Sequence, residues 1–303
     1  MVIRKISYYR VIVSLCLFMF LLSPVFGDEI SAVSFDKELP ENNIVTIQPD
    51  SLRILHNPLT GWVLYASMGV DAADFWAQYD HMYIPELGHN VSVTDYAHTL
   101  YIRASWTDFN PQEDVYGWKI DSNLRAYIEG AYQRNMRLAF RVVVDSRDKR
   151  TEFTPQFVKD AGAKGFMNKG KWSPYSDDSV FQKYYTKFVK ALAKDFNDPS
   201  KVEFIDGFGL GKWGEYHTMI YSTGDDTPKK AVFDWVTDIY SQAFDKVPVV
   251  INYHRWIGAG KDWVDDEHFA ADSEEMLEEA IKKGYSLRHD AFGMTTYYGR
   301  SEE

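Results

Sequence analysis

Short apolar runs alternate with segments of helical periodicity from Asn57 onward. The runs are rich in Val, Ile, Phe and Tyr, as buried or half-buried strands are. They predict six strands, over residues 61–68, 99–106, 138–145, 202–210, 247–254 and 291–298. Between them, apolar residues recur at three-to-four spacing. This spacing predicts helices over residues 72–79, 120–134, 179–196, 229–244 and 274–283.

Strands that alternate with helices predict a parallel sheet built of βαβ units. A doubly wound sheet and a (β/α)8 barrel of the TIM type share this pattern. Residues 68–71 read Met-Gly-Val-Asp, where a dinucleotide-binding sheet would carry a glycine-rich phosphate loop. Polar and aromatic residues also gather at the carboxyl ends of several strands, where barrels build their sites. Both observations favour an α/β fold of the TIM-barrel type.

The number of units falls short of a closed barrel, which needs eight. The pattern over residues 57–303 supplies six βα units, and a six-unit sheet leaves two open parallel edges. Either the chain is part of a longer protein, or a partner supplies the rest, or the strand count is wrong. We therefore expect an incomplete barrel, with long loops at 148–178 and 221–228 that shape a cleft.

Residues 1–27 are predicted to be a secretory signal peptide. Arg4, Lys5 and Arg10 form its basic part, and residues 11–22 are an apolar run too short for a comfortable transmembrane span. An uncleaved amino-terminal anchor is the alternative. Residues 28–56 are polar and aperiodic, which predicts a lead-in segment. We expect a secreted or periplasmic protein that is not inserted in the membrane after cleavage.

Composition narrows the possible chemistry. Cys16 is the only cysteine and lies inside the apolar run, so a thiolate zinc site and a cysteine nucleophile are excluded from the exported chain. Removing residues 1–27 takes away three basic residues and leaves 30 against 44 acidic ones, a net charge of −14. That charge argues against nucleic acid and anionic membranes as partners. Aromatic residues make up 16% of the chain; such rings stack on sugars, although most fill cores.

The strongest candidate for chemistry is a carboxylate at the end of the fourth predicted strand. Residues 202–217 read VEFIDGFGLGKWGEYH, a buried strand followed by glycines and then Glu215 among aromatic residues. Cleavage of a glycosidic bond needs one carboxylic acid as proton donor and a second carboxylate as nucleophile or base. We expect the aromatic setting to raise the pKa of Glu215 and make it the general acid/base. The alternative is an ion pair between Glu215 and an arginine such as Arg103 or Arg255.

Other strand ends supply candidate substrate-binding residues. Asp145 is expected to share the cleft with Glu215, or else to pair with Arg141 or Arg147. The remaining candidates are Arg103, Trp106, Trp213, His217, Asn252, His254 and Tyr298. Trp106 and Trp213, like Trp256, are candidates to stack on sugar and are equally suited to a core. A metal site from His217, Glu215 and His254 lacks the HExxH spacing, so we expect no metal and no cofactor.

Three stretches carry a resemblance to a known family. Residues 106–118 read WTDFNPQEDVYGW, residues 57–62 read NPLTGW, and residues 211–217 read GKWGEYH. Together they resemble exported TIM-barrel glycoside hydrolases of the β-galactosidase-like clan, over more than half of the chain. The resemblance implies a secreted glycosidase that acts on a poly- or oligosaccharide.

The resemblance also assigns roles. In that clan the acid is a glutamate after strand 4, which is Glu215 here, and the nucleophile is a glutamate after strand 7, which we expect to lie beyond Glu303. The clan's usual asparagine before the acid is Gly214 here. A non-catalytic carbohydrate-binding barrel and an inactive truncated glycosidase remain alternatives. The sugar, the linkage, the stereochemical outcome and the oligomeric state are not predicted.

Overall fold

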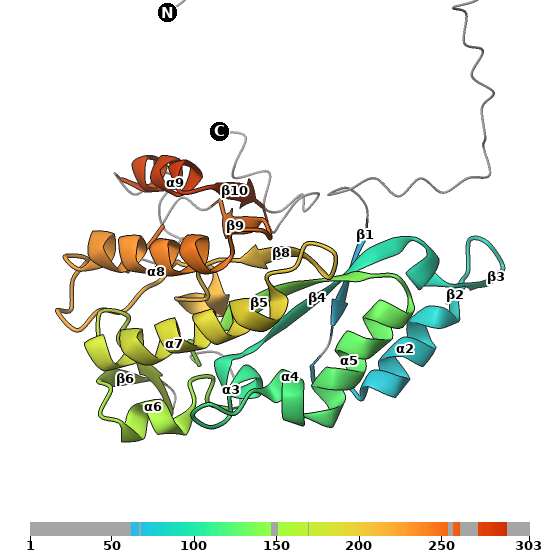
Figure 1. Cartoon of the computed structure of the whole chain (residues 1–303), viewed down its shortest axis with the longest axis horizontal. Coiled ribbons are helices and arrows are strands. Elements are labelled where there is room, and N and C mark those ends of the chain that lie inside the picture. Colours follow the sequence, from blue (N-terminus) through green and yellow to red (C-terminus); the bar gives the residue numbers. More distant parts are fainter. Residues whose placement is uncertain are drawn as a thin grey trace, which may run out of the picture. The chain divides into compact units, whose positions relative to one another are not determined.

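The computed structural model of the chain (Figure 1) describes residues 62–66, 68–146, 151–168, 170–253, 257–260 and 272–289. All of them belong to one compact unit, Ile54–Glu303. The main strands are β1 (Trp62–Ala66), β4 (Ala97–Ser105), β5 (Arg137–Val143), β8 (Val202–Asp206), β9 (Val249–Asn252) and β10 (Tyr285–Arg288). The helices between them are α2 (Ala72–Asp80), α3 (Trp106–Phe109), α4 (Gly117–Ile120), α5 (Ser122–Gln133), α6 (Gln156–Asp160), α7 (Ser179–Phe196), α8 (Lys229–Ala243) and α9 (Ser273–Lys282).

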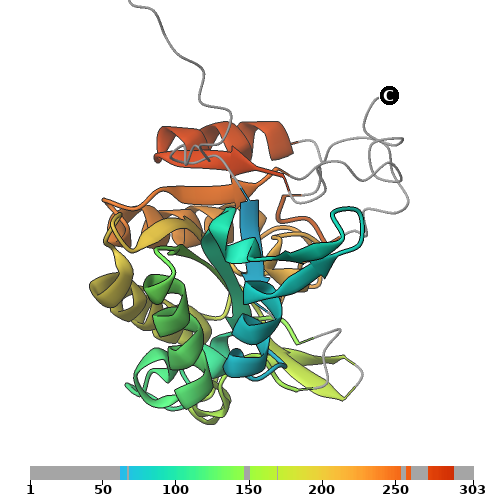
Figure 2. The ribbon, with the colours of Figure 1, turned by 90° about the vertical axis from the view of Figure 1, so that its right-hand side faces the viewer.

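The six main strands form one parallel sheet in the order β1-β4-β5-β8-β9-β10. Sheet order equals chain order, and at least one helix lies between each strand and the next. Right-handed crossovers in such a series place all the helices on one face, as in a barrel, whereas a doubly wound sheet reverses direction midway. Figures 1 and 2 show α5, α7 and α8 along one side of the sheet. The structure is therefore an α/β fold of the barrel type, and its described strands do not close.

The two faces of the sheet differ in chemistry because successive strand residues point to opposite sides. On the helix side, apolar residues of β4 and β5 join a core shared with the helices, among them Leu100, Ile102, Leu138 and Phe140. The alternate positions on the inner side carry Tyr101 and Arg103 on β4, Arg141 on β5 and Asp206 on β8. The register aligns Arg103 with Arg141, so these polar side chains lie at one level of the inner face.

A sixth parallel strand occurs where no strand was predicted. It is β10, Tyr285–Arg288, whereas the predicted strand at 291–298 lies outside the described residues. This segment reads Tyr-Ser-Leu-Arg, too short and too polar to stand out in the apolar pattern. It begins just after α9, because Gly284, with a φ of 93°, turns the chain back toward the sheet.

Two antiparallel hairpins were not predicted. β2 (Met82–Ile84) pairs with β3 (His89–Val91), and β6 (Gly165–Asn168) pairs with β7 (Lys171–Pro174). The second hairpin and α6 occupy much of the long loop expected at 148–178. A 3-10 turn, Val93–Asp95, precedes β4. Among the described helices, none is long and apolar enough to cross a membrane.

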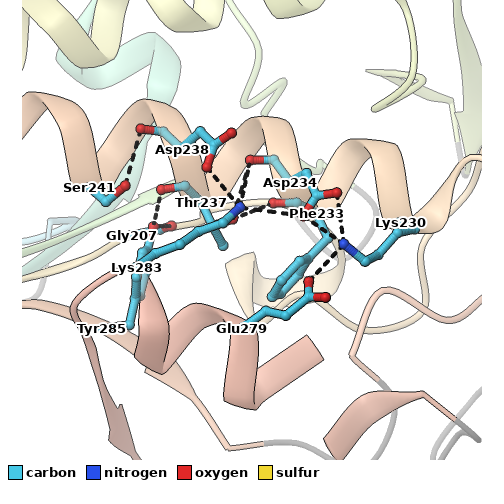
Figure 3. A network of polar contacts seen from close by, with 10 residues as sticks. All are labelled: Gly207, Lys230, Phe233, Asp234, Thr237, Asp238, Ser241, Glu279, Lys283 and Tyr285. Carbon is cyan, nitrogen blue, oxygen red and sulfur yellow. Dashed lines mark hydrogen bonds and ion pairs between the residues drawn. The ribbon is translucent and has the colours of Figure 1, made fainter. Parts of the chain in front are cut away.

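A polar network attaches β10 to helix α8 (Figure 3). The ammonium of Lys283 lies 2.7 Å from Asp238 Oδ1 and donates to Thr237 Oγ1 at 2.8 Å. The hydroxyl of Tyr285 donates to the carbonyl of Gly207 at 2.8 Å. These contacts fix the start of β10, whose last residue, Arg288, reaches the inner face.

Candidate active site

The chain leaves the sheet at Asp206, sooner than the predicted end at 210, and crosses the carboxyl end of β5. Gly209, with a φ of 74°, makes this crossing possible. A Cβ there would lie 2.5 Å from both the Val142 carbonyl and the Tyr185 hydroxyl, closer than any side chain tolerates. The segment then forms a short 3-10 turn, Lys212–Gly214, which ends at Glu215.

Glu215 is held from two sides. Arg141 donates from one terminal nitrogen to Glu215 Oε1 at 3.0 Å, and His217 Nε2 lies 3.5 Å from Oε2. The side chain of Glu215 is 16% exposed, whereas those of Arg141 and His217 are 2% and 1% exposed. The imidazole is itself fixed, because its Nδ1 lies 2.8 Å from Thr218 Oγ1. Glu215 thus presents a fixed, partly open carboxylate at the carboxyl end of the fourth strand.

The expectation of a raised pKa for Glu215 is wrong. Burial does raise the pKa, but the hydrogen bond with His217 and the charges of Arg141, His217 and Arg103 lower it by more. The pKa of Glu215 therefore lies below its ordinary value of 4.5, and the free protein holds it as a carboxylate. The sequence alternative of an ion pair with an arginine is thus realised, with Arg141 as the partner.

The lowered pKa of Glu215 predicts how the stability of the fold depends on pH. Glu215 stabilises the fold above its unfolded pKa near 4.5, and this stabilisation is lost as the pH falls through the lower folded value. Glu215→Gln carries no titrating group at this position. We expect the gap in melting temperature between wild type and Glu215→Gln to narrow as the pH falls from 7 to 3. Melts followed by circular dichroism would measure it, and a gap that widens in acid would contradict the lowered pKa.

Arg141 connects Glu215 to a second, fully buried carboxylate. Its Nε donates to Asp206 Oδ2 at 2.8 Å, and Tyr101 donates its hydroxyl to the same oxygen. Arg288 Nε lies 3.2 Å from Asp206 Oδ1. Burial lowers the pKa of Arg141, but Asp206, Tyr101 and Glu215 raise it by more, so the guanidinium stays charged. Asp206, Tyr101 and Arg288 were not among the sequence candidates.

Arg103 fixes the loop on the other side of Glu215. It donates to the Trp213 carbonyl at 2.8 Å and lies 3.5 Å from the Tyr65 hydroxyl. The backbone of the loop is strained, since Trp213, Tyr216 and Thr218 have φ values of 59°, 60° and 52°. Side chains of this size rarely adopt a positive φ, and such residues gather at functional sites.

Trp106 does not face the cleft. It is 0% exposed and packs among Phe181, Tyr185 and Phe188, with ring centroids 5.2–6.0 Å away. Ser105 caps the short helix that Trp106 begins, and this turns the indole into the helix layer. The prediction of a sugar-stacking role is therefore wrong. Trp213, in contrast, is only half-buried, with its ring 5.6 Å from that of His217.

Asp145 and Asn252 lie at other strand ends. Asp145 is buried and accepts from Ser173 Oγ of the β6–β7 hairpin at 3.3 Å, beside a cavity of water size. The described contacts thus connect Asp145 to the hairpin, whereas Arg141 pairs with Asp206 and Glu215. Asn252 ends β9 on the inner face at 4% exposure, and its Oδ1 has no hydrogen-bond partner in the part of the chain that the structure describes.

The remaining candidates, His254 and Tyr298, lie outside the described residues, as do Arg147, Arg255 and Trp256. The metal site considered from the sequence includes His254, so the described residues do not test it as a whole. Within the part of the chain that the structure describes, no group of three or more His, Cys, Asp or Glu side chains is arranged to hold a metal ion.

Comparison with solved structures finds glycoside hydrolases. Xylanase B from Clostridium stercorarium F9 is 13% identical at a TM-score of 0.43, over 79% of this chain and 65% of that one. An endo-1,4-β-xylanase from Caldicellulosiruptor owensensis is 11% identical at a TM-score of 0.39, over 69% and 58%. Endo-glycoceramidase II from Rhodococcus sp. is 13% identical at a TM-score of 0.41, over 74% and 60%.

The chain spans less than two thirds of each of these structures. At these identities and TM-scores the likenesses by themselves establish neither an activity nor a substrate. No family model and no curated protein matches the chain. The fold rests on the strand order, and the function has to be inferred from the residues of the site.

Proposed function

We propose that this chain is the barrel-forming part of a secreted or periplasmic glycoside hydrolase, with Glu215 as its general acid/base. The proposed substrate is a poly- or oligosaccharide. One observation carries the proposal: a partly open carboxylate stands at the carboxyl end of the fourth parallel strand, fixed by Arg141 and His217. Barrel enzymes place catalytic groups at this end of the sheet, and glycosidic cleavage needs a fixed carboxyl group beside the scissile bond.

The lowered pKa of Glu215 constrains how it could donate a proton. The side chain still exposes 16% of its surface, and a bound sugar would cover it. Loss of this remaining water disfavours the charged form and raises the pKa. Glu215 would therefore take up a proton as the substrate closes over it, and give that proton to the leaving oxygen. The second catalytic carboxylate is not assigned to any described residue.

A second candidate is a carbohydrate-binding barrel without catalysis. The observation that favours it is the same ion pair: a carboxylate anchored on buried Arg141 accepts hydrogen bonds from sugar hydroxyls without needing a proton. Asn252 would serve as a further hydroxyl-binding group under either proposal, and Arg103 as a further substrate-binding group.

Product formation separates the two candidates. The purified protein is incubated with a panel of plant, microbial and animal glycans, and new reducing ends are followed by NMR while binding is followed by calorimetry. We expect new reducing ends from at least one glycan. Binding with no product over long incubation would replace the hydrolase with the binding barrel, and neither binding nor product would refute both.

A further inference from the structure

We propose that the sugar bound at this site carries a carboxylate, and that Arg103 is the residue that recognises it. The inference rests on the proposed function, because it names the substrate class of the same site. The ligand is an acidic saccharide of the uronate kind, in which a carboxylate replaces the C6 hydroxymethyl group of a neutral sugar.

The first observation is that Arg103 has no carboxylate partner among the described residues. Its two contacts are neutral, the Trp213 carbonyl at 2.8 Å and the Tyr65 hydroxyl at 3.5 Å. A guanidinium offers five N–H donors in a rigid fork that matches a carboxylate. The side chain of Arg103 is only half-buried, so its N–H donors that do not take part in these two contacts are open to a ligand.

The second observation is the charge of the inner face around it. Among the described residues, the connected groups are three guanidiniums, those of Arg103, Arg141 and Arg288, and two carboxylates, those of Asp206 and Glu215. Arg141 and Arg288 both contact Asp206, so Arg103 is the guanidinium of this described group that touches no described carboxylate. Arg103 influences Glu215 only through space, by helping to lower its pKa, and a bidentate pair with a ligand carboxylate would give this half-buried charge a direct partner.

The third observation is position. Arg103 and Arg141 are register neighbours on β4 and β5, and Arg141 contacts Glu215 directly. A carboxylate on Arg103 would thus belong to a sugar next to the proposed acid. The Tyr65 side chain, whose hydroxyl lies 3.5 Å from Arg103, is exposed, and its ring could stack on that sugar. Asn252, on the same inner face, has an Oδ1 without a hydrogen-bond partner among the described residues, and this oxygen could accept from a hydroxyl.

The test uses substrate pairs that differ only at C6: the 4-nitrophenyl glucuronide and glucoside, and the galacturonide and galactoside, in both anomers. Hydrolysis and calorimetric binding are measured for wild type, Arg103→Met and Arg103→Lys. Arg125→Met, which removes the same charge from an exposed ion pair on α5, is the matched control. We expect wild type to prefer the acidic member of one pair. Arg103→Met should lose about 10- to 100-fold on that member, and much less on the neutral one.

The outcomes distinguish this inference from the proposed function. Arg103→Lys, which keeps the charge but not the fork, should recover part of the loss, and thermal melts show whether each variant is folded. Hydrolysis of neutral glycosides with no preference for acidic ones would overturn the inference and leave the hydrolase standing. Arg103-dependent binding of a uronide without hydrolysis would support the inference and refute catalysis. Binding of a uronide that Arg103→Met leaves unchanged would overturn the inference.

Discussion

Asp206→Asn is expected to lower the free energy of unfolding by about 3–5 kcal/mol, the usual cost of removing one partner of a buried ion pair. Asp206 is fully buried and is the common partner of Arg141, Arg288 and the Tyr101 hydroxyl. Arg141, whose side chain is only 2% exposed, would keep Glu215 as a partner but would lose its shortest charged contact, the one with Asp206. Urea unfolding followed by the fluorescence of the tryptophans measures the change.

Two companion variants show whether the charge is responsible. Tyr101→Phe removes one hydroxyl donor to Asp206 and should cost about 1–2 kcal/mol. The double variant Asp206→Asn/Arg141→Met removes both charges of the pair, and should be less destabilised than the sum of the two single variants. If Asp206→Asn unfolds like wild type, the buried network does not hold the inner face together.

Glu215→Gln is expected to reduce turnover by about 100- to 10,000-fold, the usual contribution of a positioned general acid or base. Glutamine keeps the size of the side chain and an oxygen for Arg141, so the loop should keep its conformation at neutral pH. The amide cannot take up the proton that the leaving oxygen requires. The measurement is kcat on whichever glycoside the wild-type protein cleaves, with binding of that glycoside followed by calorimetry.

The control for Glu215→Gln is the same substitution at a glutamate outside the site. Glu129 on α5 is exposed and pairs with Arg125 one helical turn away, so Glu129→Gln should retain full turnover. Unchanged turnover in Glu215→Gln would remove Glu215 from the proposed chemistry. A variant that neither turns over nor binds, and melts early, would show that Glu215 supports the loop instead.

Strong local signals made most of the fold predictable. Residues 179–196 were expected as a helix, and α7 has those bounds, because Asp178 caps its start and an apolar stripe continues to Phe196. Five of the main strands lie in or close to their predicted ranges, since they are rich in the β-branched and aromatic residues that favour strands. β10 was not predicted because its apolar content is low, and its place in the sheet depends on contacts of Tyr285 and Lys283 with Thr237 and Asp238 of α8.

The site was harder to predict, because its properties arise from residues far apart in sequence. Arg141 was considered only as a partner of Asp145, because residue spacing offers no means to choose between Asp145 and the more distant Asp206 and Glu215. The aromatic setting of Glu215 suggested burial, and burial is indeed the largest influence on its pKa. The opposing influences of His217, Arg141 and Arg103 outweigh it, and only the folded chain brings those groups together.

The positive φ of Trp213 has a consequence for protein engineering. A search for more stable variants would favour glycine or asparagine at this position, because both relax a left-handed backbone. Either replacement would discard the indole and loosen the peptide whose carbonyl orients Arg103. The tryptophan would thus be among the first residues lost in a selection for thermal tolerance, and among those most worth holding fixed in a selection for sugar recognition.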